Sequence, residues 1–483
     1  MKIIISYPPL NSEKGFPTLG QNRQFQFFKT PTYIYPVVPA TLATLLKQAG
    51  HEVIWLDCIA NNINLNDFLK TIAKENPDII AFETKTPVIK AHWKVIDRIK
   101  QELPETACVL FGDHVTALPE ESFQNSKVDF VVTGGDYDFL LLNLCNYLTK
   151  KDIIEPGIYY RESGQIKNTG LFRLEHDLNS LPFIDRELTG WKLYAYENGN
   201  YKRTPGTYIM SGRDCWWGKC SFCSWPTLYP KFRVRKVENV LDEIGMLIER
   251  FQIREIMDDT GSFPTGEWLT DFCHGMVKRG YHKKIYLDCN MRFGALSKED
   301  LMAMKKANFR LLLFGLESAN QNTLDRIKKN MKIEAVIQGC KSATKAGLFP
   351  HITIMFGYPW ETYKDALNTL KLGRWLLNKG YAYTMQATMV VPYPGTPLFA
   401  ECKEKGWLKT LDWNDYDMKK PVMDSPIPDD RIMKLVRGMY KVSFNPEFIF
   451  RKILSLKDMD DFRYALRAIR KVTGHLFDFG KFK

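Results

Sequence analysis

The apolar positions of residues 1–150 form short continuous runs separated by longer amphipathic stretches. A short apolar run between polar residues is typical of a strand that is buried on both faces of a parallel sheet. The stretches at 40–50 and 88–103 have helical spacing, and Gly50 is suited to a helix carboxyl end. This alternation predicts a doubly wound α/β domain at 1–150. The predicted strands cover residues 2–6, 52–56, 79–83, 108–111 and 130–132.

A second series of strands and helices follows a predicted connector at 151–205, in which Ser163-Gly164 indicates a hairpin. Between 206 and 400 apolar runs again alternate with helical stretches, such as 237–251. About six β/α units fit this region, which is fewer than the eight of a closed barrel. We therefore predict a partial (β/α)6 barrel, followed by a helical region at 401–483. The predicted strands cover residues 207–211, 255–257, 285–289, 311–314, 351–356 and 384–391.

Length and composition fit a folded protein of two or three domains. The chain has 483 residues, of which 45% are hydrophobic and 25% charged. No apolar run approaches the roughly 20 residues that a membrane-spanning helix needs. The apolar start ends at Pro8 and Pro9, too early for a secretory signal. We therefore expect a cytoplasmic protein.

The net charge of +12 is concentrated after residue 430, where basic and apolar residues mix at helical spacing. Such a pattern is most often a solvated helix face packed on a domain. It also occurs on helices that lie at a membrane surface or bind a phosphate-bearing partner. Both interpretations stay open, so peripheral membrane association is one expectation. We expect no nucleic acid partner, because this region contains no pattern of a carboxyl-terminal RNA-binding barrel.

Three of the ten cysteines, Cys215, Cys220 and Cys223, lie within nine residues, directly after the first predicted barrel strand. This is the end of a barrel where active sites are built. Three thiolates can hold three corners of a 4Fe–4S cluster and leave one iron open. A structural zinc site needs four ligands, usually as two spaced pairs, and no second pair is present. The sequence therefore favours a cluster over zinc.

The segment 211–223 resembles the cluster loop of the radical SAM superfamily, whose usual form is Cys-x3-Cys-x2-Cys. One additional residue separates Cys215 from Cys220, whereas Phe222 before Cys223 matches the family pattern. The resemblance implies a 4Fe–4S cluster, S-adenosylmethionine (SAM) and a reducing electron donor of the flavodoxin or ferredoxin type. The longer spacing changes the shape of the loop but keeps three ligands.

Polar motifs after the later barrel strands extend this resemblance. They include Asp258-Asp259-Thr260-Gly261, Gly315-Leu316-Glu317-Ser318, residues 357–362 and Pro392-Tyr393-Pro394-Gly395-Thr396. In the superfamily such strand ends contact the amino group, ribose and carboxylate of SAM, and carboxylates suit an ammonium group. The residues that the resemblance assigns to SAM are Phe222, Asp258, Asp259, Asn290, Arg292, Glu317, Ser318 and Pro392.

The first domain resembles the cobalamin-binding domain of cobalamin-dependent radical SAM enzymes, on the segments 39–53, 112–120 and 128–135. The Asp-x-His-x-x-Gly segment that supplies a cobalt ligand in methionine-synthase-type proteins is absent. Two interpretations stay open, a cobalamin site without a histidine ligand and a domain that only supports the barrel. The residues that the resemblance assigns to cobalamin are Pro8, Thr84, Gly112, Asp113, His114, Gly134 and Gly135.

The barrel most resembles branches that act on hopanoid or other isoprenoid lipids and the anaerobic cyclase of bacteriochlorophyll synthesis. The resemblance implies an enzyme that forms a 5′-deoxyadenosyl radical to functionalise an unactivated carbon of a small-molecule substrate such as a lipid. Methyl transfer is slightly favoured. The alternatives are radical cyclisation or ring rearrangement of a lipid or tetrapyrrole-like substrate, a cobalamin-free radical SAM oxidoreductase, and a non-catalytic cobalamin sensor. Phe25, Phe27 and Phe28 suit an apolar substrate or a simple lid.

Overall fold

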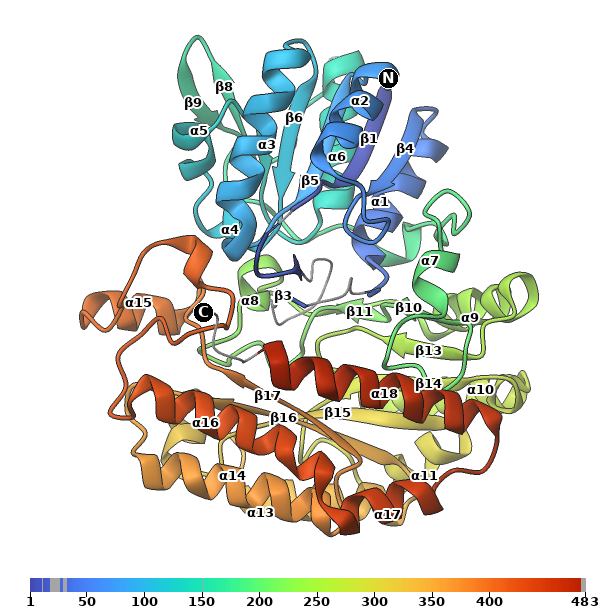
Figure 1. Ribbon diagram of the computed structural model, residues 1–483. Coiled ribbons are helices and arrows are strands. Elements are labelled where there is room, and N and C mark those ends of the chain that lie inside the picture. Colours follow the sequence, from blue (N-terminus) through green and yellow to red (C-terminus); the bar gives the residue numbers. More distant parts are fainter. Residues whose placement is uncertain (11, 18–26, 29–32, 151, 479–483) are drawn as a thin grey trace.

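The computed structural model describes residues 1–10, 12–17, 27–28, 33–150 and 152–478. It has two α/β units, one stacked on the other, with the carboxyl-terminal helices alongside the second unit (Figure 1). The predicted α/β class, doubly wound first unit and partial barrel are confirmed. The boundaries at 150, 205 and 400 stay predictions.

The first unit is a seven-stranded sheet in the order β4-β1-β5-β6-β7-β8-β9. Its first five strands are parallel, because each apolar run is followed by a helix that returns the chain to the same edge. The hairpin expected around Ser163-Gly164 is present, and it adds β8 antiparallel to β7 and β9 antiparallel to β8. The strands are β1 (Lys2–Tyr7), β4 (Glu52–Asp57), β5 (Ile79–Glu83), β6 (Ala107–Phe111), β7 (Phe130–Val132), β8 (Ile158–Glu162) and β9 (Gln165–Asn168); β2 (Phe16–Pro17) pairs with β3 (Phe27–Phe28).

Helices cover both faces of this sheet. Helices α1 and α6 contact each other on one face, and buried side chains of α2 and α3 pack into a separate apolar cluster on the other. This two-sided cover makes every central strand almost wholly apolar. The helices are α1 (Val37–Gln48), α2 (Leu65–Glu75), α3 (Ile89–Glu102), α4 (Asp113–Ala117), α5 (Glu121–Asn125), α6 (Tyr137–Lys150) and α7 (Lys192–Ala195).

The second unit is a six-stranded parallel sheet in the order β10-β13-β14-β15-β16-β17, which is also the chain order. Consecutive right-handed β/α units add strands in this way and curve the sheet into part of a barrel. The strands are β10 (Gly206–Ile209), β13 (Glu255–Asp258), β14 (Tyr286–Met291), β15 (Phe309–Glu317), β16 (Phe349–Phe356) and β17 (Thr384–Met389), and β11 (Gly212–Arg213) pairs with β12 (Arg233–Val234). The helices are α8 (Trp225–Leu228), α9 (Val237–Phe251), α10 (Glu267–Lys278), α11 (Lys298–Lys306), α12 (Gln321–Arg326), α13 (Ile333–Lys345) and α14 (Tyr363–Asn378).

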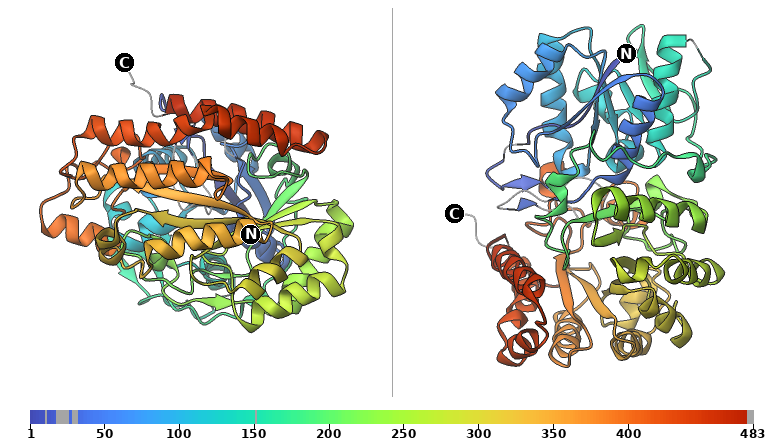
Figure 2. Two further views of the ribbon diagram at one scale, coloured as in Figure 1. Left: turned by 90° about the horizontal axis from the view of Figure 1, so that it is seen from below. Right: turned by 90° about the vertical axis from the view of Figure 1, so that its right-hand side faces the viewer.

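The carboxyl-terminal region is helical, as expected. Helix α16 packs on β17, and α18 contacts α16, so these helices lie beside the last barrel strands (Figure 2). No helix in the described part of the chain is long and apolar enough to cross a membrane. The helices are α15 (Pro397–Glu404), α16 (Asp429–Tyr440), α17 (Pro446–Leu454) and α18 (Met459–Asp478).

Buried ion pairs join the two units next to the cysteine segment. Arg213, on β11, donates from Nη1 to Asp138 at 2.9 Å and to Asp136 at 3.1 Å. Both carboxylates lie at the start of α6 and are completely buried. The backbone N–H of Gly135 also donates to the carbonyl of Leu228 at 2.9 Å. The first unit therefore holds the segment that begins the cysteine loop.

Candidate active site

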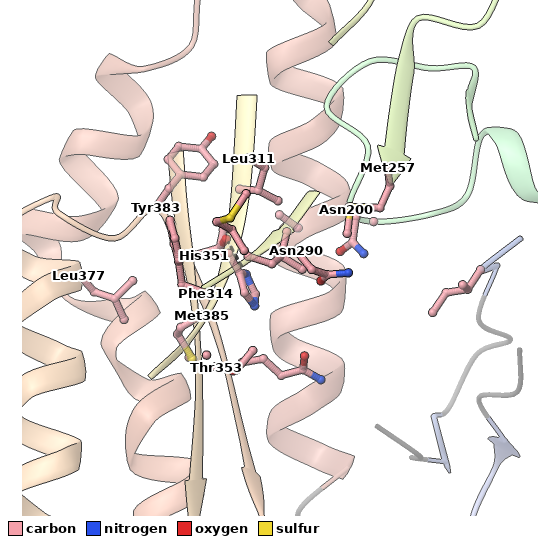
Figure 3. Close-up of a pocket in the computed structure, with 18 of the residues that line it drawn as sticks. Asn200, Met257, Asn290, Leu311, Phe314, His351, Thr353, Leu377, Tyr383 and Met385 are labelled. Atoms are coloured by element: carbon pink, nitrogen blue, oxygen red, sulfur yellow. Dashed lines mark hydrogen bonds between the residues drawn. The ribbon is translucent and has the colours of Figure 1, made fainter. Parts of the chain in front are cut away.

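A cavity of about 1210 Å³ lies inside the partial barrel. Side chains of β14 to β17 form one wall, and side chains of α17 and α18 form the wall opposite. Figure 3 shows the strand side of the cavity, with His351 and Thr353 on one strand and Tyr383 and Met385 on its neighbour. The helices beside β17 therefore close the side that an incomplete barrel would leave open.

The three clustered cysteines all line this cavity, and none forms a disulfide. The Cys223 N–H donates to the carbonyl of Cys220 at 3.2 Å, so a tight turn holds the second and third thiols on one loop. Burial raises the pKa of the Cys220 thiol, and the ammonium of Lys329 opposes that shift. A nearby cation favours the thiolate, which is the form that binds iron.

These thiols do not converge on a single point. In the described part of the chain no group of three or more His, Cys, Asp or Glu side chains could hold one metal ion. Each thiolate of a 4Fe–4S cube binds a different iron, so such ligands surround a volume. Half-buried thiols spread around one cavity fit a cluster better than a four-ligand zinc site.

Five of the residues assigned to SAM line the same cavity: Phe222, Asp259, Asn290, Arg292 and Glu317. The side-chain amide of Asn290 donates to the Thr260 carbonyl at 3.0 Å and points toward Asp259 at 3.4 Å. The Arg292 guanidinium lies over the Trp217 ring, 4.0 Å from its centre. The site thus places carboxylates and cations beside the thiols, which is complementary to the zwitterionic end of an amino acid.

A bulge in β15 turns Glu317 toward the cavity. The register with β16 shifts between Gly315 and Glu317, and Glu317 has a left-handed φ of 63°. Its Oε1 accepts a hydrogen bond from the buried Lys329 ammonium at 2.9 Å. A Cβ atom on Gly315 would lie 2.0 Å from that same oxygen, so a larger residue at 315 would displace this carboxylate.

Three other residues assigned to SAM lie behind the cavity wall. Asp258 is buried and accepts a hydrogen bond from the backbone N–H of Ser211 at 3.0 Å, which holds β10 against β13. Ser318 is buried and donates to Glu361 at 2.6 Å. Pro392 is buried between two residues that do line the cavity, Val391 and Tyr393. These three residues therefore support the site from behind.

Glu361 should make the free energy of unfolding depend on pH. This carboxyl is completely buried, and burial raises its pKa to about 7, although the hydrogen bond from Ser318 opposes the shift. Between about pH 4.5 and 7 the folded protein keeps a proton that the unfolded chain has lost. The free energy of unfolding should therefore fall by about 3 kcal/mol as the pH rises through this interval. Urea unfolding at pH 5 and pH 8 should show a smaller change in the Glu361→Gln variant, and an equal change in both proteins would contradict this assignment.

The residues assigned to cobalamin lie at the strand ends of the first unit and are packed against protein groups. Both ring nitrogens of His114 have partners, Thr86 at 3.1 Å and Glu121 at 3.0 Å. The Thr84 hydroxyl bonds His92 at 2.8 Å, and the Asp113 carboxylate accepts from the His114 backbone at 2.8 Å. Pro8 is buried at the end of β1. None of these groups lines the cavity.

The glycines of this region are also packed against protein groups. A Cβ atom on Gly134 would lie 2.4 Å from the Phe172 ring, and one on Gly135 would lie 2.0 Å from the Tyr229 ring. Gly112 has a φ of 125° and lies against the Thr84 carbonyl. Each of these glycines therefore permits a close contact with a neighbouring protein group.

The sequence interpretation did not identify some residues of the site. Asp214 accepts a hydrogen bond from the Gly261 N–H at 2.5 Å, and both line the cavity with Trp217 and Lys329. Asp214 could have been found from its place beside Cys215, but nothing in the sequence around Lys329 marks it. Of the three phenylalanines considered for a lid, Phe28 lines the cavity and Phe27 is buried, whereas Phe25 lies outside the described residues.

Each of the two α/β units contains a segment that matches a known protein family. Residues 209–373 match the radical SAM superfamily, and residues 28–139 match the B12 binding domain. The first match contains the three cysteines and the strand ends through β16. The second contains most of the first parallel sheet.

Several known proteins resemble almost the whole chain. A Pyrococcus horikoshii protein described as an uncharacterized methyltransferase is 27% identical over 465 residues, which cover 94% of this chain and 95% of that protein. The anaerobic magnesium-protoporphyrin IX monomethyl ester cyclase of Cereibacter sphaeroides is 24% identical over 398 residues, 80% of this chain and 63% of the cyclase. The structure of TsrM from Kitasatospora setae, a radical S-adenosylmethionine methyltransferase with cobalamin and a [4Fe-4S] cluster bound, is similar with a TM-score of 0.69 at 14% identity, over 98% of this chain and 99% of that one. This structural likeness shows that the two chains share a fold.

Proposed function

Because this chain belongs to the radical SAM enzymes that carry a B12-binding domain, we propose that it methylates an unactivated carbon of a small-molecule substrate held in the barrel cavity. The observation that carries the proposal is the placement of Cys215, Cys220 and Cys223 on the wall of that cavity. In such enzymes the SAM-loaded cluster supplies a carbon radical and cobalamin supplies the methyl group. A reductant must deliver the electron.

The residues beside the thiols have roles that follow from their charge and position. We assign Asp214 and Asp259 to the ammonium group of SAM, and Arg292 and Lys329 to its carboxylate. Glu317, fixed by Lys329, is placed to accept a hydrogen bond from a hydroxyl group. The apolar part of the cavity beyond them excludes water from a radical intermediate. The predicted contacts of SAM and cobalamin are part of this proposal.

Radical cyclisation is the second candidate, and the cyclase relative is the observation that favours it. Hydrogen abstraction at the same cavity would begin either reaction. The two differ in whether the product gains a methyl group, so the mass of the product separates them.

The substrate that we propose is a lipid, taken from a membrane surface by the carboxyl-terminal helices. Phe450, Leu454 and Met459 are 62%, 67% and 64% exposed, respectively. Lys457 and Arg463 are exposed among them. An apolar face with basic residues beside it is suited to anionic lipid headgroups. Sedimentation with phosphatidylglycerol vesicles should recover the protein, and equal recovery without vesicles would contradict this part.

The central proposal is tested by anaerobic reconstitution with iron, sulfide and hydroxocobalamin, followed by addition of SAM and dithionite. We expect the 4Fe–4S absorbance, retained cobalamin and 5′-deoxyadenosine that forms only with the reductant. A fully loaded cluster that yields no 5′-deoxyadenosine would overturn the radical assignment. A protein that retains no cobalamin would leave the radical chemistry but remove methyl transfer.

A further inference from the structure

The end of the cavity that is farthest from the cysteines is lined by polar and cationic side chains. His351 lies near the start of β16, Thr384 begins β17, and Tyr383 directly precedes it. The thiols lie at the opposite, carboxyl ends of the strands. The five residue steps from His351 to Phe356 alone separate the two ends by about 16 Å. We call this end, formed by His351, Lys452, Arg467 and their neighbours, the cavity floor.

We propose that the cavity floor binds an anionic group of the substrate through Lys452, Arg467 and His351, while the apolar body of the substrate extends toward the cluster. This inference rests on the proposed function, because it takes the cavity to be the substrate site. It adds the chemical class of the substrate, an amphiphile with a carboxylate or phosphate at the end remote from the reacting carbon.

Lys452 is an ammonium group that lacks a counter-charge. Its Nζ donates to the Tyr383 carbonyl at 2.7 Å and lies over the Tyr383 and Phe448 rings. No carboxylate among the described residues lies within ion-pair distance of it. Burial, and then the nearby cations Lys202 and Arg310, hold its pKa well below the usual value. A bound anion would offset both effects, because it pairs with the charge that burial disfavours.

Two further groups of the floor have unused hydrogen-bonding atoms. The Nδ1 of His351 bonds the Thr384 hydroxyl at 2.9 Å, but its buried Nε2 has no partner among the described residues. Arg467 donates from Nη2 to the Tyr201 carbonyl at 2.9 Å, and its Nε has no partner there either. Buried polar atoms are normally hydrogen-bonded, so atoms left open around a cavity indicate a ligand.

The charges at this end favour an anion over a cation. Lys202 and Asp461 form a pair at 3.0 Å and so neutralise each other. Of the remaining ionisable residues that line this part of the cavity, Lys452 and Arg467 are basic and Glu197 is acidic. Basic groups outnumber the acidic one, and the His351 imidazole is neutral at pH 7 because burial lowers its pKa to about 4. A neutral imidazole still donates one hydrogen bond to an anion.

The walls between the floor and the thiols are mostly apolar, although Thr353 and Gln386 also line them. Figure 3 shows Leu311, Phe314, Leu377 and Met385 around the space next to His351. Met257, Met291 and Met355 continue this lining. Methionine and leucine offer no hydrogen bonds, so the part of the substrate that contacts them is hydrocarbon. An anionic end bound at the floor thus places the opposite end of the molecule beside the cluster.

Calorimetry with four probes of one chain length tests the proposal: decanoate, decyl phosphate, decanol and decyltrimethylammonium. The protein is the reconstituted, SAM-loaded enzyme without reductant. We expect decanoate or decyl phosphate to bind at least tenfold more tightly than decanol, with the tighter of the two identifying the headgroup, and the ammonium probe to bind no better than decanol. Lys452→Met should reduce this preference at least tenfold while the affinity for decanol stays within twofold. Lys452→Arg should keep most of the preference.

Lys434→Met is the matched control, because Lys434 is an exposed lysine of α16 outside the cavity. Arg467→Met provides a second measurement if Lys452→Met does not fold. Equal affinities of the wild-type protein for decanoate, decyl phosphate and decanol would overturn the proposal, as would an unchanged preference in both cavity variants. The radical function is measured separately as 5′-deoxyadenosine. A preference for anionic probes without this product would refute the proposed function and keep the anion site. Formation of this product without the preference would keep the function and refute the anion site.

Discussion

Each of the single variants Cys215→Ala, Cys220→Ala and Cys223→Ala should lose the cluster absorbance and lower 5′-deoxyadenosine formation about a thousandfold or more. That loss corresponds to about 4 kcal/mol of transition-state stabilisation. Each thiol would hold one iron of the cluster, and removal of any one of them leaves only two cysteine ligands on the loop. The measurements are iron and sulfide content, the visible spectrum after reconstitution, and chromatography of the nucleoside products.

Cys340→Ala is the matched control. Cys340 is completely buried on α13 and does not line the cavity. Its replacement removes a thiol of equal size, so cluster content and product formation should stay at the wild-type level. A wild-type cluster signal in all three loop variants would show that these cysteines are not the ligands.

The parallel sheets could be predicted because a strand buried on both faces is apolar at every position. The expected runs at 2–6 and 79–83 thus lie within one residue of β1 and β5. The strand at 311–314 is longer in the structure, because β15 continues through the bulge to Glu317. A bulge depends on the register with the next strand, which the local pattern does not contain.

Some residues of the site are close together in the sequence, and others are far apart. The three cysteines share one loop, so their spacing alone indicated the cluster. Lys329 lies more than 100 residues after that loop, and Lys452 lies more than 100 residues after Lys329, yet both line the cavity. No short motif contains them. Chain topology alone brings them to one cavity, which is why the sequence did not single them out.

The glycines of the first unit show a different limit. Gly134 and Gly135 resemble a cofactor-binding turn, and the structure shows that each also permits the close approach of an aromatic ring, of Phe172 and Tyr229 respectively. Both requirements select glycine at the same positions. The presence of glycine therefore does not distinguish a cofactor contact from a packing contact.

Arg213→Met should lower the free energy of unfolding by about 3–5 kcal/mol, because it leaves a buried carboxylate without its cation. Asp138 is completely buried and directs both oxygens at Arg213. Asp136 would keep Arg233, whose Nη1 lies 2.8 Å from it, and His176 at 3.0 Å. The unpaired charge would thus be Asp138, and the urea midpoint of the full chain measures its cost.

Replacing both partners separates the charge effect from simple loss of packing. The Arg213→Met, Asp138→Leu double variant should recover most of the stability, since it leaves no buried charge unpaired. Arg279→Met is the surface control, because its partners Glu238 and Asp242 are more than half exposed, and it should cost less than about 1 kcal/mol. An Arg213→Met midpoint equal to that of the surface control would contradict the assignment.

The same variants test whether the two units act together. Arg213 is two residues before Cys215, while its carboxylate partners follow directly after Gly135 in the first unit. One buried pair therefore fixes the cluster loop against the turn that resembles a cofactor site. If this contact positions the loop, Arg213→Met should also reduce iron incorporation in protein that is still folded. The double variant should restore stability more fully than it restores iron content. Leucine and methionine fill the space, but they do not set the orientation of the loop.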